Sequence, residues 1–405
     1  MDVVVTSRGA SLGWLRPDGS PLSSLRPWDD HGPGPVWFNE QTQSWIVSGY
    51  HAAREVLLGA GWSSDPLAAD VSRQALRTAG LEDAPLAQTM LTLDPPDHDR
   101  VRGSLRDVFT PHYIASMTDG VEAITSEVIG GVAIGSEFDL MSMIAGPLPI
   151  SIIAEWLALD PSVAQMMWDE TNELVGVLEG SVLPTTQLRP IAGLTALFAE
   201  FLSAAAERRV CPGDDLLSLL ATDAELELDE VVSNAILLAI AGHETTAKLL
   251  GTSMVRLCGG EPGARLIDKL DDVGADAVLD ELFRLDGTAQ IVVRAAVDRH
   301  ELSGCTIESG ARVIVAIAAA NRDPEVFESP HDFRLNRSES HPHVALGYGR
   351  HRCLGAALSR LELRIALRQL AARKPELAGP VIWHPSGILR GPKLVPMILT
   401  DGGLR

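Results

Sequence analysis

The feature that most constrains the fold is a helical segment of about 30 residues in the second half of the chain. It begins at the acidic pair Asp229 and Glu230 and ends at the glycine pair Gly259 and Gly260. Acidic residues are typical of the first turn of a helix, and glycine is typical of the position after the last turn. At the rise of an α-helix the segment would be roughly 45 Å long. It is therefore long enough to cross a whole domain.

Helical periodicity extends over most of the remaining chain, from about residue 96 to about residue 372. We expect further helices over residues 51–58, 97–108, 114–132, 149–159, 161–178, 190–209 and 276–285. Short runs rich in β-branched residues predict strands over residues 44–48, 291–297 and 312–317. The predicted fold class is mainly α with a small β-part.

Composition and net charge indicate which class of protein this is and which partners are disfavoured. The 405 residues are 46% hydrophobic and 21% charged, which is the composition of a folded globular protein. The formal charge of -21 disfavours nucleic acid and anionic membranes as partners. Length alone suggests two or three domains. Lysine occurs only at positions 248, 269, 374 and 393, so the positive charge is mostly arginine.

The cysteines and the apolar segments indicate the compartment. Four cysteines without a C-x-x-C pair make neither a disulfide scaffold nor a zinc knuckle. Residues 1–15 lack the basic start and apolar run of a signal peptide. The apolar stretch 141–159 contains Pro147, Pro149 and Glu155, which favours a core segment over a membrane span. We therefore expect a soluble, cytoplasmic protein.

Cys353 differs from the other cysteines because it lies in a glycine-rich loop, residues 347–355, that precedes a helical apolar stripe. We expect it at the N-terminal end of that helix, where free N–H groups and the helix dipole would stabilise a thiolate. A buried structural cysteine is the ordinary alternative. A nucleotide loop is excluded, because Arg352 stands where the third glycine of G-x-G-x-x-G would fall.

This loop resembles the cysteine loop of the cytochrome P-450 haem-thiolate monooxygenases, F-G-x-G-x-H-x-C-x-G. The matching residues are Gly347, Gly349, His351, Cys353 and Gly355, and Leu346 replaces the phenylalanine. The resemblance implies the cytochrome P-450 fold, a long central helix over the haem, heme b (iron protoporphyrin IX) as cofactor, and Cys353 as the ligand of the metal. The missing aromatic ring is expected to change the packing beside the sulfur.

The long helix carries a second match. Its residues 241–246 read A-G-H-E-T-T, which places acidic and hydroxyl side chains directly after an apolar run. In the family, an acid and an alcohol at these positions relay protons for the cleavage of dioxygen. The resemblance therefore implies that Glu244 and Thr245 are the catalytic residues. A threonine here can also bond back to a carbonyl one turn earlier and bend the helix.

Two further patterns match residues that the family uses around the haem. Glu281 and Arg284 form an E-x-x-R pair, which in the family is structural and is completed by another arginine; here Arg337 and Arg334 both remain candidates. The family also holds the haem propionates with an H-x-x-x-R pair, a strand arginine and the histidine of the cysteine loop. The corresponding residues are His98, Arg102, Arg294 and His351.

The resemblance implies a single domain over residues 1–405, because residues spread along the chain must meet at one haem. It implies a monomeric monooxygenase that inserts one atom of O2 into a small, hydrophobic organic substrate by hydroxylation or epoxidation. Electrons would come from a ferredoxin and a ferredoxin reductase, and Arg350, Arg352, Arg360, Arg364 and Arg368 are a candidate docking patch. The alternative is a haem-thiolate isomerase, dehydratase or peroxide-driven enzyme.

Overall fold

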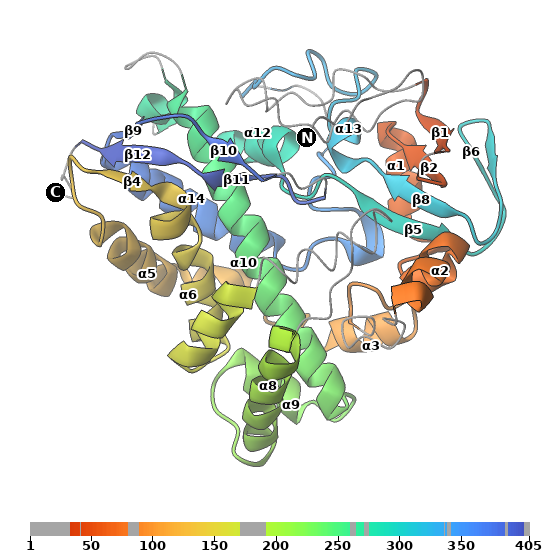
Figure 1. Cartoon of the computed structure of the whole chain (residues 1–405), viewed down its shortest axis with the longest axis horizontal. Helices are drawn as coiled ribbons and strands as arrows, with labels where there is room; N and C mark the ends of the chain where they lie inside the picture. Colours follow the sequence, from red (N-terminus) through yellow and green to blue (C-terminus); the bar gives the residue numbers. More distant parts are fainter. Residues whose placement is uncertain are drawn as a thin grey trace.

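In the computed structural model, the helix α10 (Leu228–Cys258) runs through the middle of the molecule (Figure 1). The structure describes residues 33–40, 42–79, 89–170, 192–259, 265–270, 275–335, 337, 342–384 and 388–400. α10 begins one residue before the predicted acidic pair. At its start the side chain of Glu230 accepts a hydrogen bond from the backbone N–H of Glu227 at 2.9 Å. It ends at Cys258, directly before Gly259, so the predicted helix is confirmed.

The other helices lie on either side of α10 in Figure 1, some of them beside the strands at the right. They are α1 (Tyr50–Leu58), α2 (Asp70–Ala79), α3 (Asp97–Gly103), α4 (Pro111–Ser116), α5 (Thr118–Gly130), α6 (Pro147–Trp156), α8 (Ala192–Val210), α9 (Leu216–Thr222), α12 (Ala275–Asp286), α13 (Ile317–Ala320) and α14 (Ala356–Ala372). Short helical turns are η3 (Pro66–Ala68), η5 (Met141–Ala145), η6 (Leu266–Lys269) and η7 (Gly349–His351). α10 packs against α6, α8 and α14. Residues 161–170 are helical as predicted, and residues 171–178 lie outside the described part.

Two predicted helices differ most from their expected bounds, and the helix predicted over residues 149–159 ends at Trp156. The helix predicted over residues 97–108 stops at Gly103, where Ser104 turns its hydroxyl back to Val101 O at 2.8 Å. The helix predicted over residues 114–132 is two helices, α4 and α5, separated at Met117. Thr110 caps α4 by accepting from the N–H of Tyr113 at 3.2 Å. Hydrophobic periodicity did not reveal this one-residue break, because the apolar residues keep their helical spacing across it.

The β-part lies beside the helical part, at the right of Figure 1. Its main sheet has the order β1-β2-β8-β5-β3, built from β1 (Val36–Asn39), β2 (Ser44–Val47), β8 (Arg312–Val315), β5 (Val292–Ala296) and β3 (Trp62–Ser63). β2 and β8 are parallel, and the other neighbours are antiparallel. The predicted strands at residues 44–48 and 291–297 are thus confirmed to within one residue at either end, whereas the strand predicted over 312–317 ends at Val315 and Ile317 belongs to α13.

Smaller sheets complete the molecule. They comprise β4 (Glu137–Asp139) with β12 (Pro396–Leu399) and β9 (Pro375–Leu377), β10 (Ile382–Trp383) with β11 (Pro392–Leu394), and β6 (His300–Leu302) with β7 (Cys305–Ile307). Among the described residues, none of the helices is both long and apolar enough to span a membrane.

Candidate functional site

Cys353 lies in the loop before α14, three residues from the start of the helix. Gly347 and Gly349 both have a φ of 71°, a conformation that other residues rarely adopt. A Cβ atom on Gly349 would lie only 2.5 Å from the carbonyl oxygen of Leu57 in α1. The backbone N–H of Cys353 donates to Leu346 O at 2.7 Å. The loop is therefore held by backbone contacts, which do not depend on the side chain that replaces the aromatic ring at Leu346.

The thiol of Cys353 opens onto a cavity of about 700 Å³. Although the side chain is exposed to this cavity, protein surrounds it closely, and desolvation raises the pKa of Cys353. The N–H of Gly355 and the charges of Arg102 and Arg352 act in the opposite direction and do not cancel the effect. The N–H of Gly355 thus favours the thiolate, in the direction expected at the start of a helix, but burial of the sulfur outweighs it. A positive ion at the sulfur would supply the missing stabilisation.

Four cationic or hydrogen-bonding side chains gather next to the cysteine loop from three separate elements. His98 and Arg102 come from α3, His351 from η7 and Arg294 from β5. The ring centroids of His98 and His351 are 4.2 Å apart. The charges of Arg294, His98 and Arg102 all act on His351. The structure thus brings together the four residues that the sequence pattern selects.

Burial lowers the pKa of both histidines, so the positive charge of this cluster is that of Arg102 and Arg294. Desolvation, followed by the charge of Arg294, lowers the pKa of His351 to about 3. Desolvation also lowers the pKa of Arg294, to about 10, and only Asp94 acts against it. Within the described residues, the buried Nε2 atom of His98 has no hydrogen-bond partner. Buried groups of this kind require an anionic partner, because a desolvated positive charge without one is costly. The cluster fits a ligand with carboxylates.

On α10, the A-G-H-E-T-T segment presents a hydroxyl and a carboxylate at successive positions. The hydroxyl of Thr245 donates to Ala241 O at 2.7 Å, as predicted, and the carbonyl of Thr245 accepts from the hydroxyl of Thr288 at 2.8 Å. A Cβ atom on Gly242 would meet nothing within 4 Å, so open space lies beside the helix here. The hydroxyl of Thr246 instead reaches Ser359 of α14 at 3.5 Å. Of the two threonines, Thr245 is therefore the one next to the open side of the helix.

Glu244 has a partner that the sequence analysis missed. Its carboxylate lies 2.5 Å from Nζ of Lys248, one turn further along α10. Both side chains are buried, with exposed fractions of 11% for Glu244 and 4% for Lys248. The i,i+4 spacing of an acid and a lysine was a signal for this ion pair. That signal is common on helix surfaces, and the sequence does not show that this pair is inside the protein.

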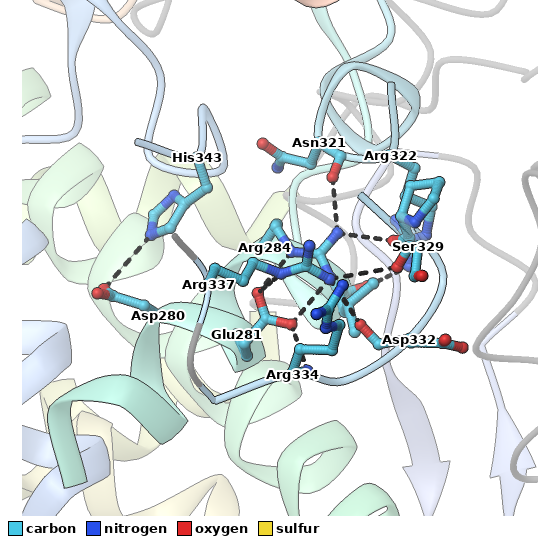
Figure 2. A network of polar contacts seen from close by, with 12 residues as sticks. Asp280, Glu281, Arg284, Asn321, Arg322, Ser329, Asp332, Arg334, Arg337 and His343 are labelled. Carbon is cyan, nitrogen blue, oxygen red and sulfur yellow. Dashed lines mark hydrogen bonds and ion pairs between the residues drawn. The ribbon is translucent and has the colours of Figure 1, made fainter. Parts of the chain in front are cut away.

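Behind the cysteine loop, Glu281 of α12 accepts from several donors (Figure 2). Arg284 makes a two-pronged contact with it, Nε to Oε1 at 2.6 Å and Nη2 to Oε2 at 2.9 Å. Arg337 donates from Nε to Oε1 at 2.8 Å, and Arg334 contributes only its backbone N–H, at 2.9 Å from Oε2. Burial opposes the ionisation of Glu281, but the two arginines hold its pKa below the usual value. The third side chain of the triad is thus Arg337.

The triad is connected to the cysteine loop through Asn321. Arg284 Nη1 donates to the carbonyl of Asn321 at 2.9 Å. The side-chain oxygen of Asn321 accepts from the N–H of Val344 at 2.7 Å. Val344 O in turn accepts from the N–H of Gly347 at 2.9 Å. This continuous path of hydrogen bonds supports a structural role for the pair Glu281 and Arg284.

The arginines proposed as a docking patch are largely neutralised by acids. Arg364 pairs with Asp276 at 2.5 Å, and Arg350 pairs with Asp99 at 2.9 Å. Further pairs join Arg360 to Asp280 and Arg368 to Glu122. Sequence spacing revealed the arginines but not these partners, which come from other helices. The charged residues that line the 700 Å³ cavity next to Cys353 are nevertheless mostly positive. They are one aspartate, Asp99, and five arginines: Arg102, Arg106, Arg352, Arg360 and Arg364.

Comparisons with known proteins agree with this geometry. The family model described as Cytochrome P450 matches residues 275–372, which contain the triad pair, the cysteine loop and α14. Cytochrome P450 107B1 of Saccharopolyspora erythraea is 33% identical over 374 residues, covering 87% of this chain and 89% of the relative. The 6-deoxyerythronolide B hydroxylase of the same organism is 32% identical over 384 residues, covering 91% and 93%.

Solved structures show the same likeness in three dimensions. The ligand-free crystal structure of CYP164A2 from Mycobacterium smegmatis has a TM-score of 0.84 to this chain at 28% identity. The match covers 95% of this chain and 98% of that one. The architecture described above, with α10 at its centre, is thus shared over nearly the whole length of both proteins.

Proposed function

Because the chain belongs to the cytochrome P450 family of haem monooxygenases, we propose that it inserts one oxygen atom from O2 into a hydrophobic organic substrate. The reaction would be a hydroxylation or an epoxidation. The observation that carries the proposal is the buried cluster of His98, Arg102, Arg294 and His351 next to Cys353. Its two guanidinium groups and its histidine N–H groups suit the two carboxylates of a haem.

Family membership implies a haem, and we propose heme b (iron protoporphyrin IX). Cys353 would ligate the iron, whose positive charge supplies the stabilisation that the thiolate lacks in the protein alone. His98 and Arg294 would contact the propionates, and these carboxylates would offset the desolvation of Arg294. When bound, the haem supplies the activation of dioxygen, and a thiolate ligand favours cleavage of its O–O bond.

Glu244 and Thr245 would deliver protons for that cleavage. The hydroxyl of Thr245 is held in position by Ala241 O, and Thr288 fixes the carbonyl of the same residue. A carboxylate next to a hydroxyl can accept a proton from solvent and pass it on. Glu244 therefore has the role of the acid, and Thr245 that of the alcohol that presents the proton at the open side of α10.

Electrons would come from a ferredoxin and its reductase. The cavity that contains Cys353 is concave and is lined by five arginines and one aspartate, so its rim suits an acidic carrier. The ion pairs of Arg360 and Arg364 reduce the net field at this face. Docking would then depend on local geometry more than on the sum of the arginine charges.

The substrate class rests on the relatives. One of them is named for the hydroxylation of 6-deoxyerythronolide B. We therefore infer an apolar natural product as the substrate of this chain. The alternative, an isomerase, dehydratase or peroxide-driven enzyme on the same fold, would not need the acid and the alcohol that Glu244 and Thr245 supply.

The test is a difference spectrum of the ferrous carbon-monoxide complex, with Cys353→Ser as the control. We expect the red-shifted thiolate band in the wild type and its loss in the variant. A wild type without that band would contradict the assignment of Cys353. Consumption of NAD(P)H and O2 with an added ferredoxin and reductase then separates a monooxygenase from the alternatives.

A further inference from the structure

The ion pair between Lys248 and Glu244 is unusual in this chain. Lys248 is one of only four lysines, and its side chain is 4% exposed. Lysine is rarely buried to this degree unless it is paired. Its Nζ lies 2.5 Å from the Glu244 carboxylate. A buried lysine therefore faces the residue that we propose as the acid of the proton relay.

The packing around Lys248 fixes its position from the other side. A Cβ atom on Gly391 would lie 2.4 Å from both Cβ and Cγ of Lys248. The loop before β11 thus lies directly on the aliphatic stem of the lysine, and only glycine leaves room for it. With the stem held between α10 and this loop, the ammonium group has little freedom to leave the carboxylate.

Other titratable groups also face the pair. His243 of α10 and the half-buried His384, which follows β10, both interact with the charges of Glu244 and Lys248. Desolvation lowers the pKa of both histidines, so they are neutral near pH 7. The positive charge opposite the carboxylate is therefore that of Lys248, and Lys393 acts on His384 from β11.

A carboxylate in a buried place either keeps a counter-charge or takes up a proton permanently. A relay needs the first condition, because a group that always holds its proton cannot accept another from solvent. We propose that Lys248 is a positioning residue of the proton relay: its ion pair holds the Glu244 carboxylate in a fixed place inside the protein, where it takes up each proton. This inference rests on the function proposed above.

Three variants test it: E244Q, K248M and the double variant. K248M retains an unbranched side chain against Gly391 and removes the ammonium group at its end. The matched control is K393M, because Lys393 is exposed on the neighbouring strand. Each haem-loaded protein is reduced by NADPH through a plant-type ferredoxin and its reductase, without an organic substrate. The carbon-monoxide difference spectrum verifies the thiolate ligand in each.

The measured quantity is the division of O2 between peroxide and water. Two electrons and two protons convert O2 to H2O2, whereas four of each convert it to two H2O with cleavage of the O–O bond. Since a positioned proton donor is worth about 100-fold or more in rate, we expect E244Q and K248M each to raise the peroxide fraction about twofold or more. K393M should match the wild type.

The double variant decides whether Lys248 acts through Glu244. If it does, E244Q/K248M gives the same peroxide fraction as E244Q, because the lysine has nothing left to position. A higher fraction in the double variant than in E244Q, or a wild-type fraction in K248M, would overturn the proposal. Should K248M fail to hold haem, the comparison of E244Q with the charge-neutral double variant remains decisive.

Urea unfolding of the same haem-loaded proteins gives a reading without turnover. We expect the double variant to lower the folding equilibrium constant by less than the product of the two single effects, as for any directly coupled pair. Strict additivity would contradict the pairing. A wild type that lacks the carbon-monoxide band would instead overturn the proposed function, so the two failures are distinguishable.

Discussion

Nε of Arg337 lies 2.8 Å from Oε1 of Glu281, although 56 residues separate the two in the sequence. The same oxygen accepts from Arg284, so the buried carboxylate is shared by two guanidinium groups. Arg337→Ala leaves Glu281 paired with Arg284 but removes one charged donor from a buried carboxylate, so the free energy of unfolding should fall by about 2 kcal/mol. Urea unfolding measures this, and haem content should fall in parallel.

Arg334→Ala is the matched control for that variant. The side chain of Arg334 is 38% exposed and pairs with Glu328 at the surface, and only its backbone N–H reaches Glu281. We expect a loss below about 1 kcal/mol. Equal losses in the two variants would contradict the assignment of Arg337 to the triad.

Two glycines of the cysteine loop should differ in how much stability is lost when each is replaced by alanine. Gly349→Ala places a methyl group 2.5 Å from Leu57 O on a backbone with a φ of 71°, which should cost about 2 kcal/mol or more. Gly355 has a φ of -77° and nothing within 4 Å of a Cβ atom, so Gly355→Ala should cost less than about 1 kcal/mol. Thermal unfolding and haem retention distinguish the two, and a tolerated Gly349→Ala would show that α1 does not constrain the loop.

His343 should make the protein sensitive to acid. Desolvation, and then the charge of Arg360, lower the pKa of His343 to about 4, against an ordinary value of 6.5. The pKa of His343 is lower in the folded state than in the unfolded state. Its contribution to the free energy of unfolding is therefore full above about pH 6.5 and is lost as the pH falls towards about 4. Between about pH 7 and about pH 5 the loss from this group is about 2 kcal/mol.

The histidine is tested by urea unfolding of the wild type and His343→Gln at both pH values. The variant should lose about 2 kcal/mol less than the wild type over this interval, because the other titrating groups are common to both proteins. The same pH dependence in the two proteins would mean that His343 is not the sensor.

The two threonines of α10 should differ in their effect on turnover. Thr245→Ala removes the hydroxyl on the open side of the helix, and we expect more of the consumed NADPH to appear as H2O2. Thr246→Ala removes only the contact to Ser359 of α14, and it should leave that fraction unchanged. Peroxide and NADPH assays on both variants measure this, and the opposite ranking would move the relay to Thr246.

Charge reversal at the proposed docking face tests the electron donor. Arg364→Glu lines the cavity of Cys353 with an acid and places it next to Asp276. We expect the apparent Kd for an acidic ferredoxin to rise about tenfold at low salt, and less at high salt. Arg299→Glu, on an exposed residue that pairs with Glu301 and Glu308, is the control for net charge. Equal effects would indicate general repulsion instead of docking.

Local patterns predicted much of the fold. The acidic start and glycine end of α10 were evident, as were the strands containing Arg294 and Arg312. The break at Met117 was not, because the periodicity of apolar residues continues through it. Likewise, spacing alone could not distinguish Arg337 from Arg334, since the choice depends on how the chain turns after α13.

The site was predictable to the extent that the resemblance supplied it. His98 and His351 were identified by motif, and the structure brings their rings to 4.2 Å. The burial of Lys248 and the acidic partner of Arg364 were not predictable, because both depend on elements that are distant in sequence. Which charges are paired and which are buried is therefore decided only when the distant segments of the chain come together.

The order of the main sheet has a consequence for synthesis of the chain. β2 pairs with β8 in parallel, with Trp45 opposite Val313. At typical translation rates, roughly 15 to 50 s pass between the emergence of these two strands. During that interval the edge of β2 that faces β8 has no partner, and an open strand edge invites pairing with other chains. The hairpin of β1 and β2 is thus synthesised early, but its parallel partner β8 is synthesised much later. Conditions that slow translation should leave this edge of β2 exposed for longer.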